Sequence, residues 1–306
     1  MAGIGVKSSL EFAELLPAEI KNLVTIEHTQ IADFHWFNLV SEKNDSLISD
    51  RVFTGFDKDI DTAFSKAVSE MIERKSFSTG NKAKLQSCAT KRSDGFAAFP
   101  ISNDLKLAVY KARENALNEA IERYAWATWW DQHEIIYKHE KKSTQDFCDK
   151  HRYLKKLFTE LHQKLEFDFI HLIEPDIQNS EKKLIIIVAE FKGGVVTGGA
   201  CDDSERSESI LVRSFSELLR HALVVIQNKQ RPTHLTDYEK RLLYFASETG
   251  KGSFYKRISQ KGTLGIKLPP LETDTQVPSN KTHYVHRCLF QNQPPFIDEN
   301  FERMCL

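Results

Sequence analysis

The chain has 306 residues, of which 41% are hydrophobic and 28% are charged, and its formal net charge is -1. This composition predicts a folded globular protein and excludes a largely disordered one. A net charge near zero provides no strong positive field, so no nucleic-acid partner is expected. The five cysteines form no C-x-x-C pair, and no apolar segment is long enough for a membrane helix. We therefore expect a cytoplasmic protein with reduced thiols and no membrane partner.

Hydrophobic periodicity and turn residues predict alternating helices and strands. Helices are expected near 9–23, 59–76, 103–137, 143–164, 205–227 and 235–247. Strands are expected at 33–40, 51–55, 167–173, 183–190, 195–197 and 284–290, and residues 96–101 are read as a short apolar stretch. The polar segment 79–93 is expected to be a loop.

No boundary has the composition of a domain linker. The sequence therefore predicts an α/β (α+β) fold in which residues 1–306 form a single intertwined unit. Its sheets are expected to be mixed or antiparallel and packed by helices. Residues 262–306, which are richer in proline and turn residues, are expected to form a C-terminal tail.

One short element, A-x3-A-x2-E-x2-E-R, occurs twice on predicted helices. The first copy is Ala63, Ala67, Glu70, Glu73 and Arg74, and the second is Ala112, Ala116, Glu119, Glu122 and Arg123. This spacing places two carboxylates and a guanidinium on one face of each helix. Two such helices packed together would need cations between their carboxylates, and Mg²⁺ with phosphate oxygens suits hard oxygen ligands. Ordinary salt bridges on solvated helix faces have the same spacing, so spacing alone leaves this alternative open.

Three stretches in sequence resemble the ATP-site segments of the YcaO family. They are GFDKDIDTAFSKAVSEMIERKSF, SDGFAAFPISNDLKLAVYKARENALNEAIERYAWATWWD and LIIIVAEFKGGVVTGGACDDSERSESILVRSFSELLRH, and together they span about residues 50–228. The resemblance implies a YcaO-like fold around an ATP site, in which glutamates hold Mg²⁺ and Mg²⁺ holds the ATP phosphates.

The same resemblance assigns roles to individual residues. The implied metal ligands are Glu70, Glu73, Glu119 and Glu122. The implied nucleotide-binding set adds Arg74, Arg123 and Glu217 to these glutamates. The residues implied to act in catalysis are Arg74, Arg123, Arg213, Glu217 and Arg220.

The family resemblance implies that ATP phosphorylates the oxygen of a peptide backbone amide. The expected product is an azoline, formed by cyclodehydration of Cys, Ser or Thr in a ribosomally made peptide. The expected partners are the precursor peptide and a protein that binds its leader, and a homo-oligomer is left open. Two alternatives remain: a catalytically degenerate scaffold or regulatory subunit, and thioamide or amidine formation at the same site.

Three positions depart from the family pattern. Lys66 stands where the family often has Ser, Asn115 occupies the corresponding position of the second copy, and Arg220 stands where the family often has Gln. These changes favour the degenerate alternative, whereas the two intact E-x-x-E-R motifs favour the enzyme.

Other signals receive structural interpretations. Trp126, Trp129 and Trp130 are expected to form a core stripe, with adenine stacking as the alternative. His133 and His139 are six residues apart, which is not the spacing of a helical zinc motif, so they are expected on a solvated helix. No P-loop motif is present.

Overall fold

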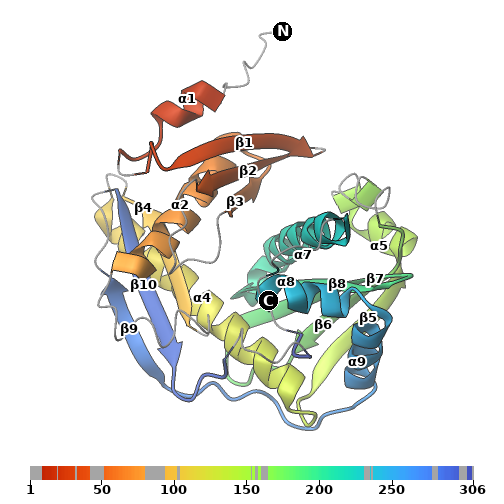
Figure 1. The fold of residues 1–306 in the computed structure, drawn as a ribbon. Helices are drawn as coiled ribbons and strands as arrows, with labels where there is room; N and C mark the ends of the chain where they lie inside the picture. The colour runs from red at the N-terminus through yellow and green to blue at the C-terminus, as the bar shows by residue number, and fades with distance from the viewer. Residues whose placement is uncertain are drawn as a thin grey trace. The chain divides into compact units, whose positions relative to one another are not determined.

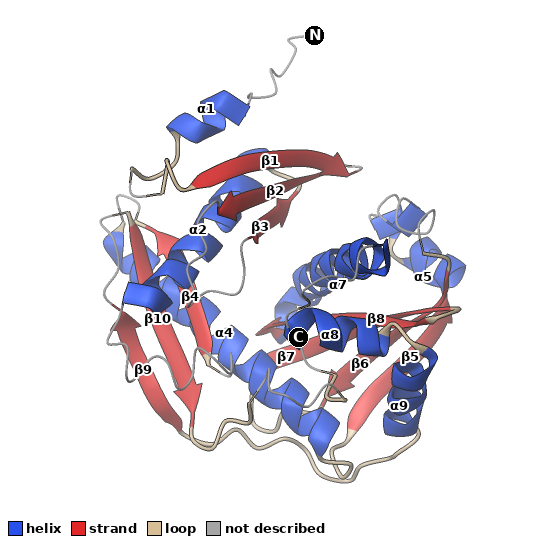
Figure 2. Ribbon diagram, in the orientation of Figure 1, coloured by secondary structure: helices blue, strands red, loops and turns tan. Residues whose placement is uncertain are grey.

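A computed structural model describes most of the chain (Figure 1). The described residues are 9–18, 20–31, 33–41, 52–79, 94–101, 104–152, 154–155, 158–159, 165–230, 235, 237–277, 282–295 and 302–304. They contain both helices and antiparallel sheets, as Figure 2 shows, so the α+β fold class is confirmed. No helix among them is sufficiently long and apolar to cross a membrane.

The chain divides into two compact units, each made of three separate segments. Unit 1 comprises Met1–Gln86, Phe96–Glu114 and Thr275–His286, and unit 2 comprises Ser87–Gly95, Asn115–Asp274 and Arg287–Leu306. The boundaries cut through individual helices and strands. Whether residues 1–306 act as a single domain stays a prediction.

Unit 1 contains an antiparallel sheet of strand order β1-β2-β3, in which Trp36 lies opposite Phe56. The bounds of these elements and of the helices before and after them are α1 (Ser9–Glu14), β1 (Val24–Ile31), β2 (Phe34–Ser41), β3 (Val52–Asp57) and α2 (Ile60–Thr79). One face of α2 packs on β2 and β3, and their buried side chains form a hydrophobic core that includes Phe37, Phe53 and Met71.

Four further elements include residues of both units. They are β4 (Gly95–Pro100), α4 (Leu105–Asp131), β9 (Leu271–Val277) and β10 (His283–Phe290). Strand β10 lies between β4 and β9 in a sheet.

Unit 2 contains an antiparallel sheet of strand order β5-β6-β7-β8. Its elements are β5 (Tyr137–Ser143), α5 (Thr144–Lys150), β6 (Phe167–Pro175), β7 (Lys182–Phe191), β8 (Gly194–Asp203), a 3-10 turn η1 (Ser204–Arg206), α7 (Ser207–Gln230), α8 (Asp237–Phe245) and α9 (Glu248–Ile258). Strand β7 is buried from Leu184 to Phe191, which explains the apolar run from Leu184 to Ala189.

Both faces of β8 are covered. Gly198 lies against the backbone of α7, and the next residue, Gly199, lies against the ring of Trp126 in α4. Successive strand residues point to opposite faces of a sheet. The two glycines therefore allow a helix to approach each face closely.

Most predicted elements are confirmed, and the differences have local causes. Strands β1, β5 and β9 were not predicted, because each alternates polar and apolar residues weakly. The predicted helix 103–137 is wrong at its end: α4 stops at Asp131 and β5 begins at Tyr137. The predicted helix 235–247 is confirmed as α8, and α9, which begins at Glu248, was not predicted. The expected loop 79–93 lies almost entirely outside the described residues.

Candidate functional site

Three glycines bring a strand against a helix backbone in the same way. A Cβ at any of them would overlap a helix carbonyl oxygen and the backbone nitrogen four residues later. The contacts are Gly55 with Ala63 and Ala67, Gly95 with Ala116 and Ala120, and Gly198 with Ser214 and Leu218. Only glycine permits so close an approach at these positions.

A polar contact also recurs in each case. It is made by the helix residue seven positions after the one whose carbonyl oxygen lies against the strand glycine. Each time, a helix side chain bonds the backbone of the residue before the strand glycine. Glu70 Oε2 accepts from Thr54 N at 2.7 Å, Arg123 Nη1 donates to Asp94 O, and His221 Nδ1 donates to Thr197 O at 2.6 Å. The same strand–helix motif is therefore built three times.

The structure shifts the two sequence copies by one turn relative to their strands. Ala63 of the first copy corresponds in space to Ala116, not to Ala112. Lys66 consequently occupies the position that Glu119 and Glu217 occupy in the other two strand–helix motifs. Its ammonium group bonds Asp57 Oδ2 at 2.6 Å.

In unit 2, two glutamates bond the free edge of β8. Glu217 Oε2 accepts from Gly199 N at 2.7 Å, and Glu122 Oε2 accepts from Cys201 N at 3.2 Å. Residues two apart on a strand donate toward the same side. Strand β8 thus aligns a carboxylate from α4 with one from α7.

Three arginines lie among these carboxylates. Arg123 is ion-paired with Glu119, and Arg220 Nη2 lies 3.3 Å from Glu217 Oε1. Arg213 Nη1 bonds Asp202 Oδ2 at 3.1 Å. The carboxylate cluster, as we call it, comprises Glu119, Glu122, Arg123, Arg213, Glu217 and Arg220.

The electrostatics of the carboxylate cluster favour protonation. Burial raises the pKa of Glu122 well above its usual range, and the negative charges of Glu217 and Glu119 raise it further. Burial also raises the pKa of Glu217, although Arg220 and the Gly199 N–H oppose the shift. Crowded carboxylates with raised pKa values can be stabilised in their charged form by a cation.

The donor set has the chemistry of a site for a hard divalent cation, although the carboxylate oxygens of Glu119, Glu122 and Glu217 do not all lie within 4.8 Å of one another. Its ligand atoms would all be carboxylate oxygens, which Mg²⁺ prefers. The Glu217 and Glu119 side chains remain 19% and 25% exposed, so solvent ions can reach them. The structure thus brings together six of the predicted site residues.

The remaining predicted residues form a second group in unit 1. Arg74 Nη1 lies 3.6 Å from Glu73 Oε1, and its Nη2 lies 4.0 Å from Glu70 Oε1. The Glu73 and Arg74 side chains are each 12% exposed. Their roles in metal and nucleotide binding stay predictions.

Two buried aspartates were missed from the sequence. Asp94 is fully buried, accepts a bond of 2.6 Å from Arg287 Nε, and carries the carbonyl that Arg123 bonds. Asp202 orients Arg213. The sequence signal was weak: Asp94 directly precedes a strand glycine, and Asp202 follows one by three residues.

The tryptophan stripe is a core feature at two of its three positions. Trp126 and Trp129 are fully buried, and Trp130 is partly exposed. The predicted helical setting of His139 is wrong, because it lies in β5 and bonds His171 at 3.0 Å. His133 follows the end of α4.

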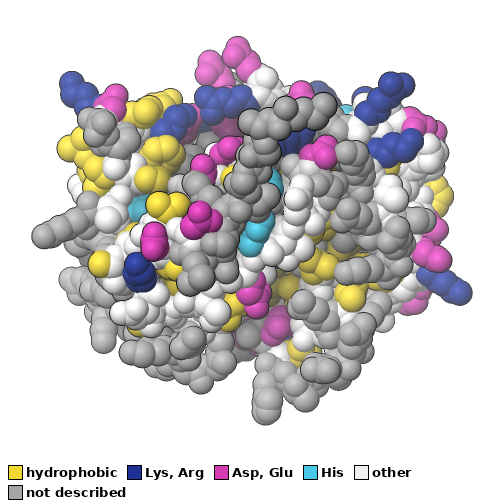
Figure 3. Space-filling model, turned by 90° about the horizontal axis from the view of Figure 1, so that it is seen from above, with side chains coloured by type: hydrophobic (Ala, Val, Ile, Leu, Met, Phe, Trp, Pro, Cys, Tyr) yellow, Lys and Arg dark blue, Asp and Glu magenta, His cyan; other side chains and the backbone are white. Residues whose placement is uncertain are grey.

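Charges of both signs are interspersed on the face drawn in Figure 3, in keeping with the net charge of -1.

Comparison with known proteins decides the fold. A structure of YcaO from Methanopyrus kandleri, described as bound with AMPPCP and Mg²⁺, matches with a TM-score of 0.54 and 14% identity, covering 97% of this chain and 92% of that chain. The chain has a YcaO fold. No family model and no curated protein matches the sequence. The YcaO-like fold expected from the three sequence segments is confirmed.

Proposed function

We propose that this YcaO-like chain is an ATP- and Mg²⁺-dependent enzyme that activates a peptide backbone amide by phosphorylating its oxygen. The observation that carries the proposal is the carboxylate cluster. It aligns Glu122 and Glu217 on one strand edge and surrounds them with guanidinium groups. Its resemblance to the family's motifs and the nucleotide-bound state of the structural neighbour support the same reading.

Within the carboxylate cluster, Glu119, Glu122 and Glu217 would hold Mg²⁺. Bound Mg²⁺ supplies charge neutralisation at the phosphates. Arg213 and Arg220 are each oriented by a carboxylate, through bonds of 3.1 and 3.3 Å. A guanidinium group oriented in this way can bind phosphate oxygens bidentately. The contribution of the chain is therefore positioning and electrostatic stabilisation.

In the proposed reaction, the side chain of Cys, Ser or Thr adds to the amide carbon and loses its proton. The amide oxygen takes the γ-phosphoryl group of ATP, and ADP is released. Phosphate and the amide proton then leave, which gives the C=N bond of an azoline. The precursor peptide is the proposed substrate, and a leader-binding protein in the cytoplasm is the proposed partner. A thioamide or amidine product is the alternative and would require an added sulfur or amine nucleophile.

Calorimetric titration with ATP and Mg²⁺ tests the proposal without the peptide. We expect the wild-type protein to bind and Glu119→Ala to bind at least about tenfold more weakly, because a removed carboxylate leaves the cation under-coordinated. Glu181→Gln, an exposed change outside the carboxylate cluster, should bind like wild type. Absence of wild-type binding would favour the degenerate scaffold, for which the lysine at position 66 is the supporting observation.

A further inference from the structure

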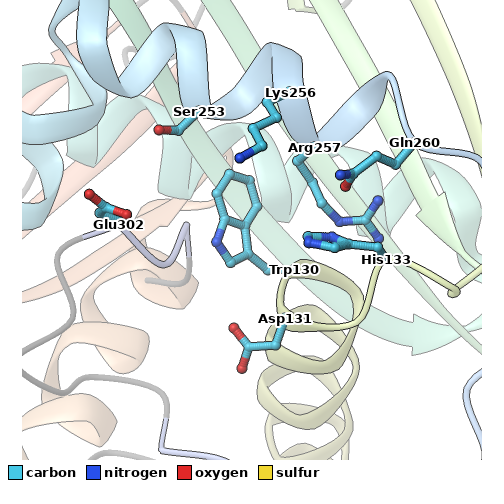
Figure 4. Close-up of a pocket in the computed structure, with 8 residues that line it drawn as sticks. All are labelled: Trp130, Asp131, His133, Ser253, Lys256, Arg257, Gln260 and Glu302. Carbon is cyan, nitrogen blue, oxygen red and sulfur yellow. The ribbon is translucent and has the colours of Figure 1, made fainter.

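A second candidate site lies in unit 2, where α9 passes the end of α4. A cavity of about 260 Å³ is lined there by side chains that include Trp130, His133, Lys256 and Arg257 (Figure 4). None of these residues belongs to the carboxylate cluster. Trp130 is eight residues after Glu122, which is about 12 Å along the axis of α4.

Arg257 is a buried cation in the wall of this cavity. Its residue is only 2% exposed, and burial lowers its pKa. Its Nε and Nη2 donate to Trp129 O, and Nη2 also donates to Gln132 O at 3.3 Å. Nη1 is buried and has no hydrogen-bond partner in the described part of the chain. The guanidinium group also lies over the rings of Trp129 and Tyr137, at 4.7 and 5.2 Å from their centroids. A buried charge with an unpaired N–H group is costly, so a bound anion would be favoured here.

The neighbouring side chains add the ammonium group of Lys256, an aromatic wall and two carboxylates, those of Asp131 and Glu302. In Figure 4, the Lys256 side chain extends from α9 toward the Trp130 indole. Lys256 is exposed and has no ion pair with any residue that the structure describes. Asp131 also lines the cavity, but its two oxygens bond Arg303 at 2.9 and 2.6 Å. Its charge is therefore already compensated.

A purely structural role explains part of this arrangement. The carbonyls of Trp129 and Gln132 lie at the end of α4, where a cation stabilises the partial negative charge of a helix terminus. That role accounts for Nε and Nη2 of Arg257. It does not account for Nη1, for the ammonium group of Lys256 or for the open space beside the indole.

We propose that this cavity binds a carboxylate that is carried next to a planar or apolar group. The carboxylate would accept from Arg257 and Lys256, and the adjoining group would pack on the Trp130 ring. Two sources share this chemistry: a peptide carboxylate and a free aromatic acid. The proposal is independent of nucleotide binding. If the chain does act on peptides, this cavity would bind a part of the substrate that is remote from the reacting amide.

Calorimetry with small probes tests the proposal and separates the two sources. The probes are N-acetylphenylalanine, its uncharged analogue N-acetylphenylalaninamide, and benzoate. We expect at least one of the two acids to bind about tenfold more tightly than the amide, because only an acid can accept charge-assisted hydrogen bonds. Tighter binding of N-acetylphenylalanine than of benzoate indicates a peptide source, and the reverse order indicates a free acid.

Substitutions then locate the binding. Lys256→Gln and Trp130→Leu should each weaken acid binding about tenfold. Lys138→Gln, at an exposed lysine of β5 that does not line the cavity, should leave it unchanged. Arg257→Lys should weaken binding while keeping a cation, and its melting temperature reports any loss of the α4 cap. No acid binding by wild type, equal binding of acid and amide, or undiminished binding by both Lys256→Gln and Trp130→Leu would overturn the proposal.

Discussion

At the scale of single residues, the carboxylate cluster combines two opposing requirements. Glu122 and Glu217 are held on the same strand edge, where burial raises both pKa values. Such crowding destabilises the folded protein unless a proton or a cation is bound. The same crowding would make Mg²⁺ binding favourable. Stability of the free protein and affinity for the cation are therefore expected to change in opposite directions.

The substitution Glu122→Gln tests this opposition. It keeps the shape of the side chain and removes its charge, so the melting temperature of the ligand-free protein should rise, while affinity for Mg²⁺ with ATP should fall at least about tenfold. Thermal unfolding and calorimetry measure the two effects. Glu181→Gln is the matched exposed control and should change neither quantity. A variant that is less stable and binds normally would show that Glu122 serves packing alone.

Binding should also release protons. A bound cation favours the charged form of a carboxylate, so it lowers the raised pKa of Glu122 and Glu217. The heat of Mg²⁺·ATP binding to wild type should therefore depend on the ionisation enthalpy of the buffer. The dependence should shrink in Glu122→Gln. Equal dependence in the two proteins would exclude this glutamate as the source of the protons.

At the scale of elements, strand glycines determine how closely each helix approaches its sheet. The close contacts at Gly55, Gly95 and Gly198 place Glu70, Arg123 and His221 at equivalent positions. These positions hold a glutamate, an arginine and a histidine. The three strand–helix motifs therefore share a backbone arrangement and differ in the charge of this side chain.

Gly198→Ala and Gly252→Ala form a matched pair of substitutions. The added methyl group at Gly198 would overlap the backbone of α7, which would push the helix from β8. We expect unfolding free energy to fall by about 3 kcal/mol and Mg²⁺·ATP binding to weaken. Gly252, inside α9, has no atom within 4 Å of such a methyl group. Its substitution should stabilise the protein by about 0.5–1 kcal/mol, because alanine favours helix.

Urea titrations of both variants measure these changes. Equal stability of the two variants would show that β8 and α7 can separate without cost.

At the scale of the whole molecule, buried histidines make stability depend on pH. Burial lowers the pKa of His171 to about 4 and that of His221 to about 3. Unfolded histidine binds a proton near pH 6.5. The unfolded chain therefore binds more protons below pH 6.5, and stability is lost as the pH falls from 6.5 toward these folded values.

His221→Gln should reduce this acid sensitivity. The glutamine amide can still donate to Thr197 O but does not titrate. Between pH 7 and pH 5, His221 should cost about 2 kcal/mol of unfolding free energy, and the variant should lose that much less than wild type. Urea titrations at the two pH values measure the difference. The opposing effect of the glutamates is common to both proteins and cancels. Equal losses would show that His221 takes up its proton over the same pH range in the folded and the unfolded protein.

Elsewhere in unit 2, Glu190 is held by a network of hydrogen bonds and ion pairs. It accepts from Tyr255, Lys251 and His171, and the pKa of its carboxyl group is lowered to about 2. These contacts join α9 to β7. We therefore assign Glu190 to the stability of unit 2.

The sequence by itself determined the helices and strands with strong periodicity, and it supplied the candidate site residues, whose roles stay predictions. Local patterns were sufficient for these predictions, because burial and helix geometry act within a few residues. The apolar run predicted β7, and the spacing predicted that Glu119, Glu122 and Arg123 share a face of α4. Weakly alternating strands such as β5 could not be identified, since their neighbours in the sheet define them.

Only the tertiary structure decided which site residues share a location and in what register. Glu122 and Glu217 are far apart in the chain and meet because both bond the edge of β8. The one-turn shift between Ala63 and Ala116 follows from strand glycines that the helix pattern does not contain. The orphan N–H of Arg257 likewise exists only where α9 meets α4. Contacts between distant segments depend on close packing, and no local pattern records packing.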